Sequence, residues 1–302
     1  MNSARSVLLL GGSGFFGPAL AGAFGPLVAA RTYATHPIDR GVIFDARTSS
    51  VAELVSGLPA RPTAAVVMLG VTGIDACARD PEGTAEVNVR AVIRVLRELG
   101  GLGVTPVFLS SDAVFDGTRA YWKEGDEARP ILTYGRQKLE VERFLGSLPP
   151  PWLIVRLPKL LSARPDPRCM LTQWIDALGR EDPIPCATDQ FFTPAGTLDA
   201  ATAIAELVRE RAHGLYHLGG PERLSRRALL QAVIEEYRKF AAPRAKIVEC
   251  SLRDIRSFEE PRPLDTSMNA ERFASRHATR FRAASEIARE AVRSRYTGQV
   301  SA

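Results

Sequence analysis

A tyrosine and a lysine lie four residues apart at Tyr134 and Lys138, and these two side chains are suited to proton transfer. On a helix, positions i and i+4 share one face, so the phenol and the ammonium would line the same site. A phenol with an unperturbed pKa of about 10 donates its proton more readily when a nearby cation stabilises the phenolate. Alone, this spacing favours two ordinary surface residues, so a catalytic interpretation needs further residues.

Two hydroxyls, Ser110 and Ser111, stand at the end of an apolar run typical of a buried strand. In an open α/β sheet, ligands bind outside the carboxyl ends of the strands. A serine at that place donates a hydrogen bond to a substrate carbonyl, and the tyrosine supplies the proton. The serines and the Tyr–Lys pair together therefore predict a site that binds a substrate carbonyl and supplies a proton.

A glycine-rich segment follows the first predicted strand and begins a helix, with glycines at positions 11, 14 and 17. Glycines permit a tight turn and a close approach of the backbone to a pyrophosphate, which the helix N-terminus attracts. The sequence therefore predicts dinucleotide binding rather than a merely structural turn. The residues expected to bind the cofactor are Gly11, Ser13, Gly14, Phe15, Phe16, Gly17, Leu69, Gly70, Ser110, Tyr134 and Lys138.

The identity of the cofactor depends on the end of the second predicted strand, where Arg31 and Thr32 stand and no carboxylate follows. An acidic residue there would hold the ribose of NAD, whereas an arginine pairs with the 2′-phosphate of NADP. We therefore expect NADP to be preferred over NAD, the alternative being that Arg31 is a solvated surface residue. Asp45 ends the third short strand and would bind the adenine amino group or cap the next helix.

The chain resembles the extended short-chain dehydrogenases/reductases, and within them the dTDP-4-dehydrorhamnose reductases and their sugar-nucleotide-modifying relatives. The resemblance covers nearly the whole chain. Its carriers are the segments 11–17, 110–117, 134–138, 189–194 and 214–218, with Arg262-Pro263 before Asn269. The chain departs from the family pattern at Leu132, Ala113, 157–159 and 68–71.

The resemblance implies that Ser111, Tyr134 and Lys138 are catalytic and that Ser111, Asp112 and Arg262 contact the substrate. Arg164 and Arg168 are further candidates by position, and no metal site is expected. The implied function is NAD(P)H-dependent reduction of a keto group on a nucleotide-linked sugar. Two alternatives remain open: a sugar-nucleotide epimerase or dehydratase of the same fold, and a non-catalytic NADP-binding regulatory subunit.

The elements that must position these residues alternate between strands and helices through the first half of the chain. This alternation predicts an α/β fold, a Rossmann-type doubly wound parallel sheet with a smaller C-terminal substrate-binding lobe. We expect a dinucleotide-binding domain over 1–157 and a substrate-binding lobe over 158–302, with about 185–211 returning to pack on the first domain. The expected strands are 6–10, 27–32, 41–44, 64–69, 104–110 and 152–156, and the expected helices are 18–24, 51–58, 82–99, 132–145, 198–211 and 225–240.

Composition places the chain among ordinary globular proteins, with 302 residues, 45% hydrophobic residues and a formal net charge of +5. No basic run of the kind typical of nucleic-acid binders dominates, and no apolar stretch reaches the length of a membrane span. The four cysteines are scattered, which favours reduced thiols over disulfides or zinc ligands. We therefore expect a cytoplasmic protein with a small-molecule substrate, no nucleic-acid or membrane partner, and a possible homodimer.

Overall fold

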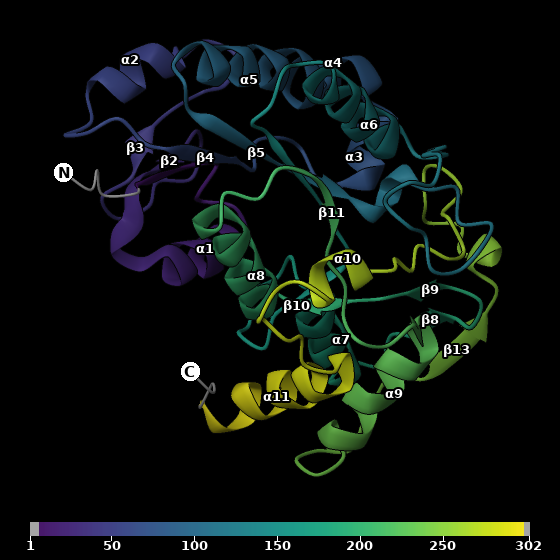
Figure 1. Cartoon of the computed structure of the whole chain (residues 1–302). Helices are drawn as coiled ribbons and strands as arrows, with labels where there is room; N and C mark the ends of the chain where they lie inside the picture. Colours follow the sequence, from purple (N-terminus) through teal and green to yellow (C-terminus); the bar gives the residue numbers. More distant parts are fainter. Residues whose placement is uncertain (1–5, 299–302) are drawn as a thin grey trace.

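The computed structural model describes residues 6–298, in which a seven-stranded sheet is joined to a second lobe (Figure 1). The strand order is β11-β6-β5-β4-β1-β2-β3, and every neighbouring pair is parallel. The strands are β1 Val7–Leu10, β2 Val28–Tyr33, β3 Val42–Ile43, β4 Ala64–Val67, β5 Thr105–Ser111, β6 Leu153–Leu157 and β11 Gly214–His217. The predicted doubly wound parallel sheet is therefore confirmed.

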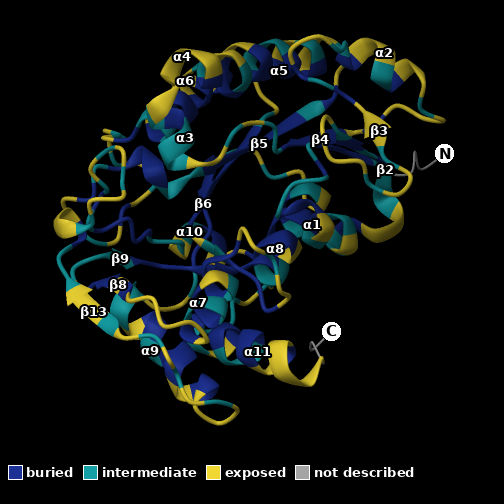
Figure 2. Ribbon diagram, turned by 180° about the vertical axis from the view of Figure 1, so that it is seen from behind, coloured by how far each residue is buried: buried dark blue, intermediate teal, exposed yellow. Residues whose placement is uncertain are grey.

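Helices cover both faces of the sheet, because alternate residues of each strand point to opposite sides. Val7 and Leu9 of β1 pack toward α1 (Gly17–Phe24) and α8 (Thr197–Arg209). Leu8 and Leu10 pack toward the opposite layer, which contains α2 Val51–Ser56, α5 Val92–Gly101 and α6 Thr133–Gly146. Figure 2 shows the resulting buried strands between the two layers of helices, whose outer faces are exposed. The carboxyl ends of all seven strands consequently meet at one edge.

The long helix expected over 82–99 is interrupted in the structure. It consists of α4 (Pro81–Ala85), a π-helical turn η2 (Glu86–Ala91) and α5. The turn includes Asn88, which is buried and forms hydrogen bonds with other segments of the chain. Periodicity near 3.6 residues continues on both sides of the turn, so the sequence pattern did not reveal it.

A strand from the C-terminal half completes the sheet. β11 pairs with β6, and the preceding helix α8 packs against α1. Residues beyond 157 thus contribute α8 and β11 to the layers around the sheet. The division of the chain between 157 and 158 stays a prediction.

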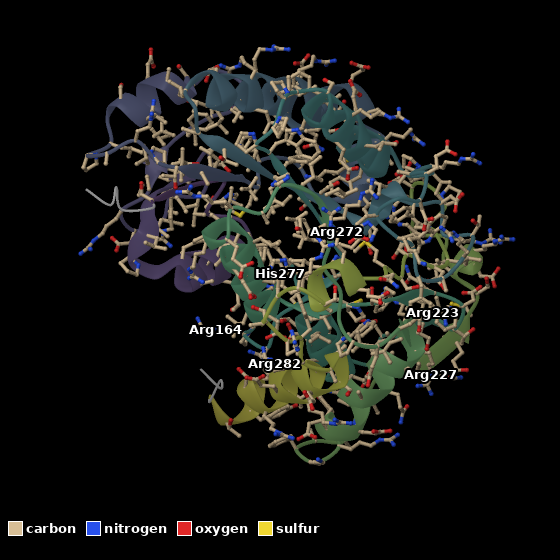
Figure 3. The ribbon with its side chains drawn as sticks, in the orientation of Figure 1. Arg164, Arg223, Arg227, Arg272, His277 and Arg282 are labelled. Atoms are coloured by element: carbon tan, nitrogen blue, oxygen red, sulfur yellow. The ribbon has the colours of Figure 1, made fainter. Side chains whose placement is uncertain are left out.

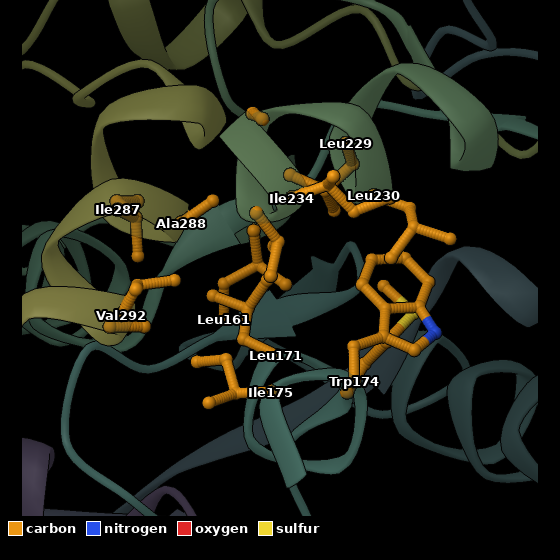
Figure 4. Close-up of a cluster of buried hydrophobic side chains, with 14 of the residues drawn as sticks. Leu161, Leu171, Trp174, Ile175, Leu229, Leu230, Ile234, Ile287, Ala288 and Val292 are labelled. Atoms are coloured by element: carbon orange, nitrogen blue, oxygen red, sulfur yellow. The ribbon is translucent and has the colours of Figure 1, made fainter. Parts of the chain in front are cut away.

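The second lobe has its own hydrophobic core between three helices, α7 (Met170–Leu178), α9 (Arg226–Tyr237) and α11 (Ala284–Thr297). Figure 4 shows Trp174 of α7 packed beside Leu230 of α9. The other elements of the chain are α3 Ile74–Arg79, η1 Gly25–Leu27, η3 Asp112–Val114, β7 Leu160–Leu161, β8 Ile184–Ala187, β9 Phe191–Phe192, β10 Ala195–Gly196, β12 Leu224–Ser225, β13 Ile247–Cys250, η4 Leu252–Asp254 and α10 Glu271–Ala274. Over residues 6–298, no helix combines the length and the hydrophobicity needed to cross a membrane.

Candidate active site

The glycine segment forms two tight turns between β1 and α1. The Gly14 N–H donates to the Gly11 carbonyl at 3.1 Å, and the Gly17 N–H donates to the Gly14 carbonyl at 3.0 Å. A Cβ on Gly17 would lie 2.0 Å from the Gly12 carbonyl oxygen, so only glycine fits where the helix begins. The turns therefore bring the backbone of the glycine segment and the start of α1 to the edge of the sheet, a geometry suited to a pyrophosphate.

The two phenylalanines of this segment have different surroundings. Phe16 is 7% exposed and belongs to the core between the sheet and α1, which makes it a packing residue. Phe15 packs against the core of the second lobe instead, and the Arg168 guanidinium lies 5.8 Å from its ring centroid. Arg168 itself pairs with Asp166 at 2.7 Å. Phe15 thus connects the expected cofactor loop with the second lobe.

The two residues expected to bind the adenosine end of the cofactor are Arg31, near the end of β2, and Asp45, which follows β3. A Cβ on Gly12 would lie 3.1 Å from the Cβ of Arg31, so Arg31 is next to the glycine loop. The Arg31 guanidinium donates to the Asp39 carbonyl at 2.9 Å. Asp45 pairs with Arg47 at 2.7 Å, and the hydrogen bonds from Arg47 lower the pKa of Asp45. Arg31 is accordingly the better placed of the two to meet a cofactor.

A buried amide network supports the loop at Leu69 and Gly70, which follows β4. The Val71 N–H donates to Asn88 Oδ1 at 2.6 Å, and Asn88 Nδ2 donates to the Val71 carbonyl at 2.9 Å. Asn88 Nδ2 also donates to Gln137 Oε1 at 2.7 Å. Since Gln137 directly precedes Lys138, the network fixes this loop relative to α6. No periodicity or motif in the sequence pointed to Asn88 or Gln137.

The helix α6 brings Tyr134 to the serines at the end of β5. A Cβ on Gly135 would lie 2.0 Å from the Ala113 carbonyl, so glycine is required where α6 meets η3. Lys138 Nζ lies 5.6 Å from the centroid of the Tyr134 ring and donates to the Leu109 carbonyl at 2.9 Å. Tyr134, Lys138 and the end of β5 are thus neighbours, although more than twenty residues of sequence separate them.

The electrostatic surroundings keep the phenol protonated. Burial raises the pKa of Tyr134 above its usual value, and the nearby Asp112 and Cys77 raise it further. Burial lowers the pKa of Lys138 to about 8, although Glu142 and Cys77 oppose this. Lys138 lies beside the phenol ring and donates to a backbone carbonyl. A phenol that is protonated at neutral pH is suited to donating a proton to a developing alkoxide.

Ser111 and Ser110 differ in what they can contact. The Ser111 hydroxyl donates to Asp112 Oδ1 at 2.9 Å and accepts the Ala113 N–H at 3.2 Å. Asp112 Oδ2 accepts the Thr266 hydroxyl at 2.8 Å, and burial raises the pKa of Asp112. The Ser110 hydroxyl is buried and has no hydrogen-bond partner within residues 6–298. Ser111 is therefore the more accessible of the two serines.

The segment 258–262 crosses between α3 and α6. Arg262 pairs with Asp75 of α3 at 2.5 Å, and its side chain is only 8% exposed. The Glu260 carboxylate accepts the Thr133 N–H at 3.0 Å and so caps the N-terminus of α6. Arg164, in contrast, is exposed at the periphery of the molecule (Figure 3). Arg262 therefore lies in the segment that contacts α6, whereas Arg164 lies apart from Tyr134, Lys138 and Ser111.

A cluster of possible metal ligands lies outside this site. Glu206, Glu210 and His277 bring their ligand atoms within 4.8 Å of one another. Glu206 already accepts the N–H groups of Ala278 and Thr279, and His277 pairs with Glu210 at 2.8 Å. These contacts hold the segment after α10 against α8. The cluster therefore has a structural role in packing these two segments together.

Comparison of sequences relates the whole chain to one family. Residues 5–296 match the family described as RmlD substrate binding domain. The chain is 27% identical over 281 residues to the dTDP-4-dehydrorhamnose reductase of Escherichia coli, and this covers 90% of the chain and 92% of that protein. It is 34% identical over 151 residues to the probable low-salt glycan biosynthesis reductase Agl14 of Haloferax volcanii, which covers 49% of the chain and 50% of that protein.

Solved structures give the same relationship. A hypothetical dTDP-4-dehydrorhamnose reductase from Sulfolobus tokodaii superposes with a TM-score of 0.80 at 26% identity, over 92% of this chain and 96% of that one. The dTDP-4-dehydrorhamnose reductase of Bacillus anthracis in complex with NADP superposes with a TM-score of 0.77 at 20% identity, over 94% of this chain and 97% of that one. The fold is therefore shared over almost the full length of each protein.

Proposed function

Because this chain belongs to the RmlD substrate binding domain family of extended short-chain dehydrogenases/reductases, we propose that it reduces a keto group on a nucleotide-linked sugar. Relatives in this family are NAD(P)-dependent oxidoreductases, and we propose Tyr134 as the proton donor. The observation that carries the proposal is that Lys138 lies 5.6 Å from the Tyr134 ring centroid and donates to Leu109 of β5, the strand that ends in Ser111.

The residues present fit a dinucleotide, since the glycine turns leave no room for a Cβ at Gly17 and present N–H groups to the ligand. Reduced nicotinamide, when bound, would supply a hydride to the carbonyl carbon. Tyr134 would then donate its proton to the carbonyl oxygen, which has received the electron pair of the broken π bond. Ser111 would turn its hydroxyl from Asp112 to that oxygen, and Lys138 would stabilise the phenolate left behind.

NADP is the cofactor that we propose as preferred, because Arg31 lies beside the glycine loop and has no ion pair with a described carboxylate. The Bacillus anthracis neighbour was solved with NADP, which supports this choice.

We also propose a cytoplasmic location and a homodimer. An epimerase would retain an oxidised cofactor tightly and consume no NADPH, so the same assay distinguishes it from a reductase.

The first test is oxidation of NADPH by the purified protein with dTDP-, UDP- and GDP-linked 4-keto sugars, for the wild type and for Tyr134→Phe. We expect Tyr134→Phe to lose about 10²- to 10⁴-fold in kcat, because it removes the general acid, while the Kd for NADPH stays within twofold. Tyr121→Phe is the matched control, because Tyr121 is 53% exposed and lies outside α6. Full activity in Tyr134→Phe would overturn the assignment, and NADPH binding without turnover would favour a regulatory subunit.

A further inference from the structure

Three cationic side chains, from the segment after β6, the start of α9 and the segment 258–262, have no part in the reaction described above. They are Lys159, Arg226 and Arg262, and the Lys159 ammonium lies close enough to the other two, and to Asp112, for their charges to interact. We propose that Lys159, together with Arg226, binds a carboxylate on the sugar, so that the substrate is a nucleotide-linked uronate. This inference rests on the proposed function and specifies its substrate class.

Lys159 lies beside the hydroxyl that is expected to bind the reacting carbonyl. β5 and β6 are parallel neighbours with Ser111 opposite Leu157, and Lys159 follows two residues later. Adjacent strands lie about 4.8 Å apart, so the backbone at Lys159 is one strand away from the end of β5. The Lys159 charge acts on Asp112, which itself accepts the Ser111 hydroxyl at 2.9 Å. A cation in this place is close to the reacting end of the sugar.

The charge of this group is not balanced within the protein. Arg262 is neutralised by Asp75, but neither Lys159 nor Arg226 forms an ion pair with a carboxylate of residues 6–298. Arg226 Nε is buried without a hydrogen-bond partner in the same part of the chain, and its guanidinium lies over the Trp174 ring at 5.1 Å. Cations that repel each other and lack a counter-ion destabilise the free protein, and a bound anion would remove that cost.

The accessibility of Lys159 distinguishes it from a structural lysine. Its side chain is exposed to solvent, yet the surrounding protein desolvates it enough to lower its pKa. Its backbone carbonyl accepts the Ala195 N–H at 3.1 Å, which fixes the start of the side chain. A lysine that is held in place, reachable from solvent and free of a protein carboxylate is available to a ligand.

The phosphates of the two ligands are expected elsewhere. The glycine loop follows β1, which lies three positions from β6 in the sheet, or about 14 Å at the usual strand spacing. The cofactor pyrophosphate is therefore remote from Lys159. The diphosphate of the substrate is separated from a ring ketone by the sugar ring itself. A carboxylate on the ring carbon next to the ketone, in contrast, lies within reach of a cation beside Ser111.

Binding of two probes, UDP-glucuronate and UDP-glucose, to the cofactor-saturated protein tests this inference by isothermal titration calorimetry. The probes share the nucleotide, the diphosphate and the ring, so the ratio of their Kd values isolates the carboxylate. We expect the wild type to bind UDP-glucuronate about tenfold more tightly or better, as a charge-assisted contact would give. Lys159→Met should abolish the preference, whereas Lys159→Arg should retain most of it.

Lys246→Met is the matched control, because Lys246 is exposed and lies in the second lobe beside β13. Thermal unfolding checks that each variant is folded. Equal Kd values for the two probes in the wild type, or no binding of either, would overturn the inference. An equal loss for both probes in Lys159→Met would also overturn it and would assign Lys159 to the shared diphosphate. A retained preference, with no NADPH oxidation by any nucleotide-linked 4-keto sugar including the 4-keto form of UDP-glucuronate, would instead overturn the proposed reaction and leave the carboxylate site in place.

Discussion

Lys138 carries its ammonium at a position from which the protein excludes water. Only 7% of the residue is exposed, and its Nζ donates to the Leu109 carbonyl and lies 4.7 Å from the Phe108 ring centroid. The same burial raises the pKa of Tyr134. Burial therefore lowers the pKa of Lys138 and raises that of Tyr134, and a ligand that brings negative charge would raise the pKa of the lysine again.

This burial predicts a measurable dependence of stability on pH. The pKa of Lys138 is lowered from 10.5 to about 8, so between these values the unfolded chain holds a proton that the folded chain has lost. The free energy of unfolding should therefore rise from pH 8 to pH 10.5, by about 3 kcal/mol from this group. Urea unfolding of the ligand-free protein at several pH values should show that Lys138→Met lacks this rise. A rise of the same size in the wild type and in Lys138→Met would contradict the interpretation.

At the scale of elements, a buried ion pair fixes the catalytic helix on the sheet. Arg156 of β6 donates from Nη2 to Glu142 of α6 at 2.7 Å, and both side chains are about 5% exposed. Arg156 Nη1 lies 3.2 Å from Nε2 of His217 in β11. Since arginine can only donate, His217 accepts at Nε2 and donates from Nδ1 to the Trp122 carbonyl. Burial and the Arg156 charge lower the pKa of His217 to about 3, which keeps it neutral.

Removal of one charge of this pair should therefore be costly. Glu142→Gln leaves Arg156 buried without a counter-ion, and we expect a loss of about 3 to 5 kcal/mol in the free energy of unfolding. The double variant Glu142→Leu/Arg156→Met replaces both charges by apolar groups and should recover most of that loss. Chemical denaturation of both proteins measures the difference. A double variant as unstable as Glu142→Gln would show that the cost comes from lost packing and not from an unpaired charge.

At the scale of the whole molecule, the two lobes meet around the expected cofactor site. Phe15 of the glycine loop packs on the core of the second lobe, and the segment 258–262 caps α6 from the other side. Asp112 is likewise bound to Thr266, 154 residues away. A ligand that contacts the glycine loop should accordingly stabilise the whole chain and not only the sheet.

Thermal unfolding should therefore report cofactor preference. A ligand at one hundred times its Kd stabilises the folded state by about 2.7 kcal/mol, which for a chain of 302 residues corresponds to a rise in Tm of about 4 °C. We expect NADPH to raise Tm more than NADH at equal concentration, because Arg31 would pair with the 2′-phosphate. Arg31→Ala should remove that difference, and Arg61→Ala, which changes an exposed arginine after α2, should retain it. Equal shifts by both cofactors in the wild type would refute a preference for NADP.

Sequence spacing by itself determined the local parts of this protein. Short segments determine their own local structure through residue type and spacing. Examples are the glycines between a strand and a helix, the apolar strand that ends in Ser111, and the pair Tyr134 and Lys138 four residues apart. The predicted strands through β6 and the helix α6 follow from the same periodicity, and the structure contains them. The family resemblance rested on these segments as well.

Only the tertiary structure decided what surrounds them. β11 joins the sheet, and Asn88 forms hydrogen bonds with Val71 and Gln137. Glu260 caps α6, and the charges of Lys159 and Asp112 interact. No periodicity of the sequence connects any of these partners. The physical reason is that periodicity reports only which face of its own element a residue occupies. Which distant group meets that face depends on how the whole chain buries its apolar surface and satisfies its buried polar groups.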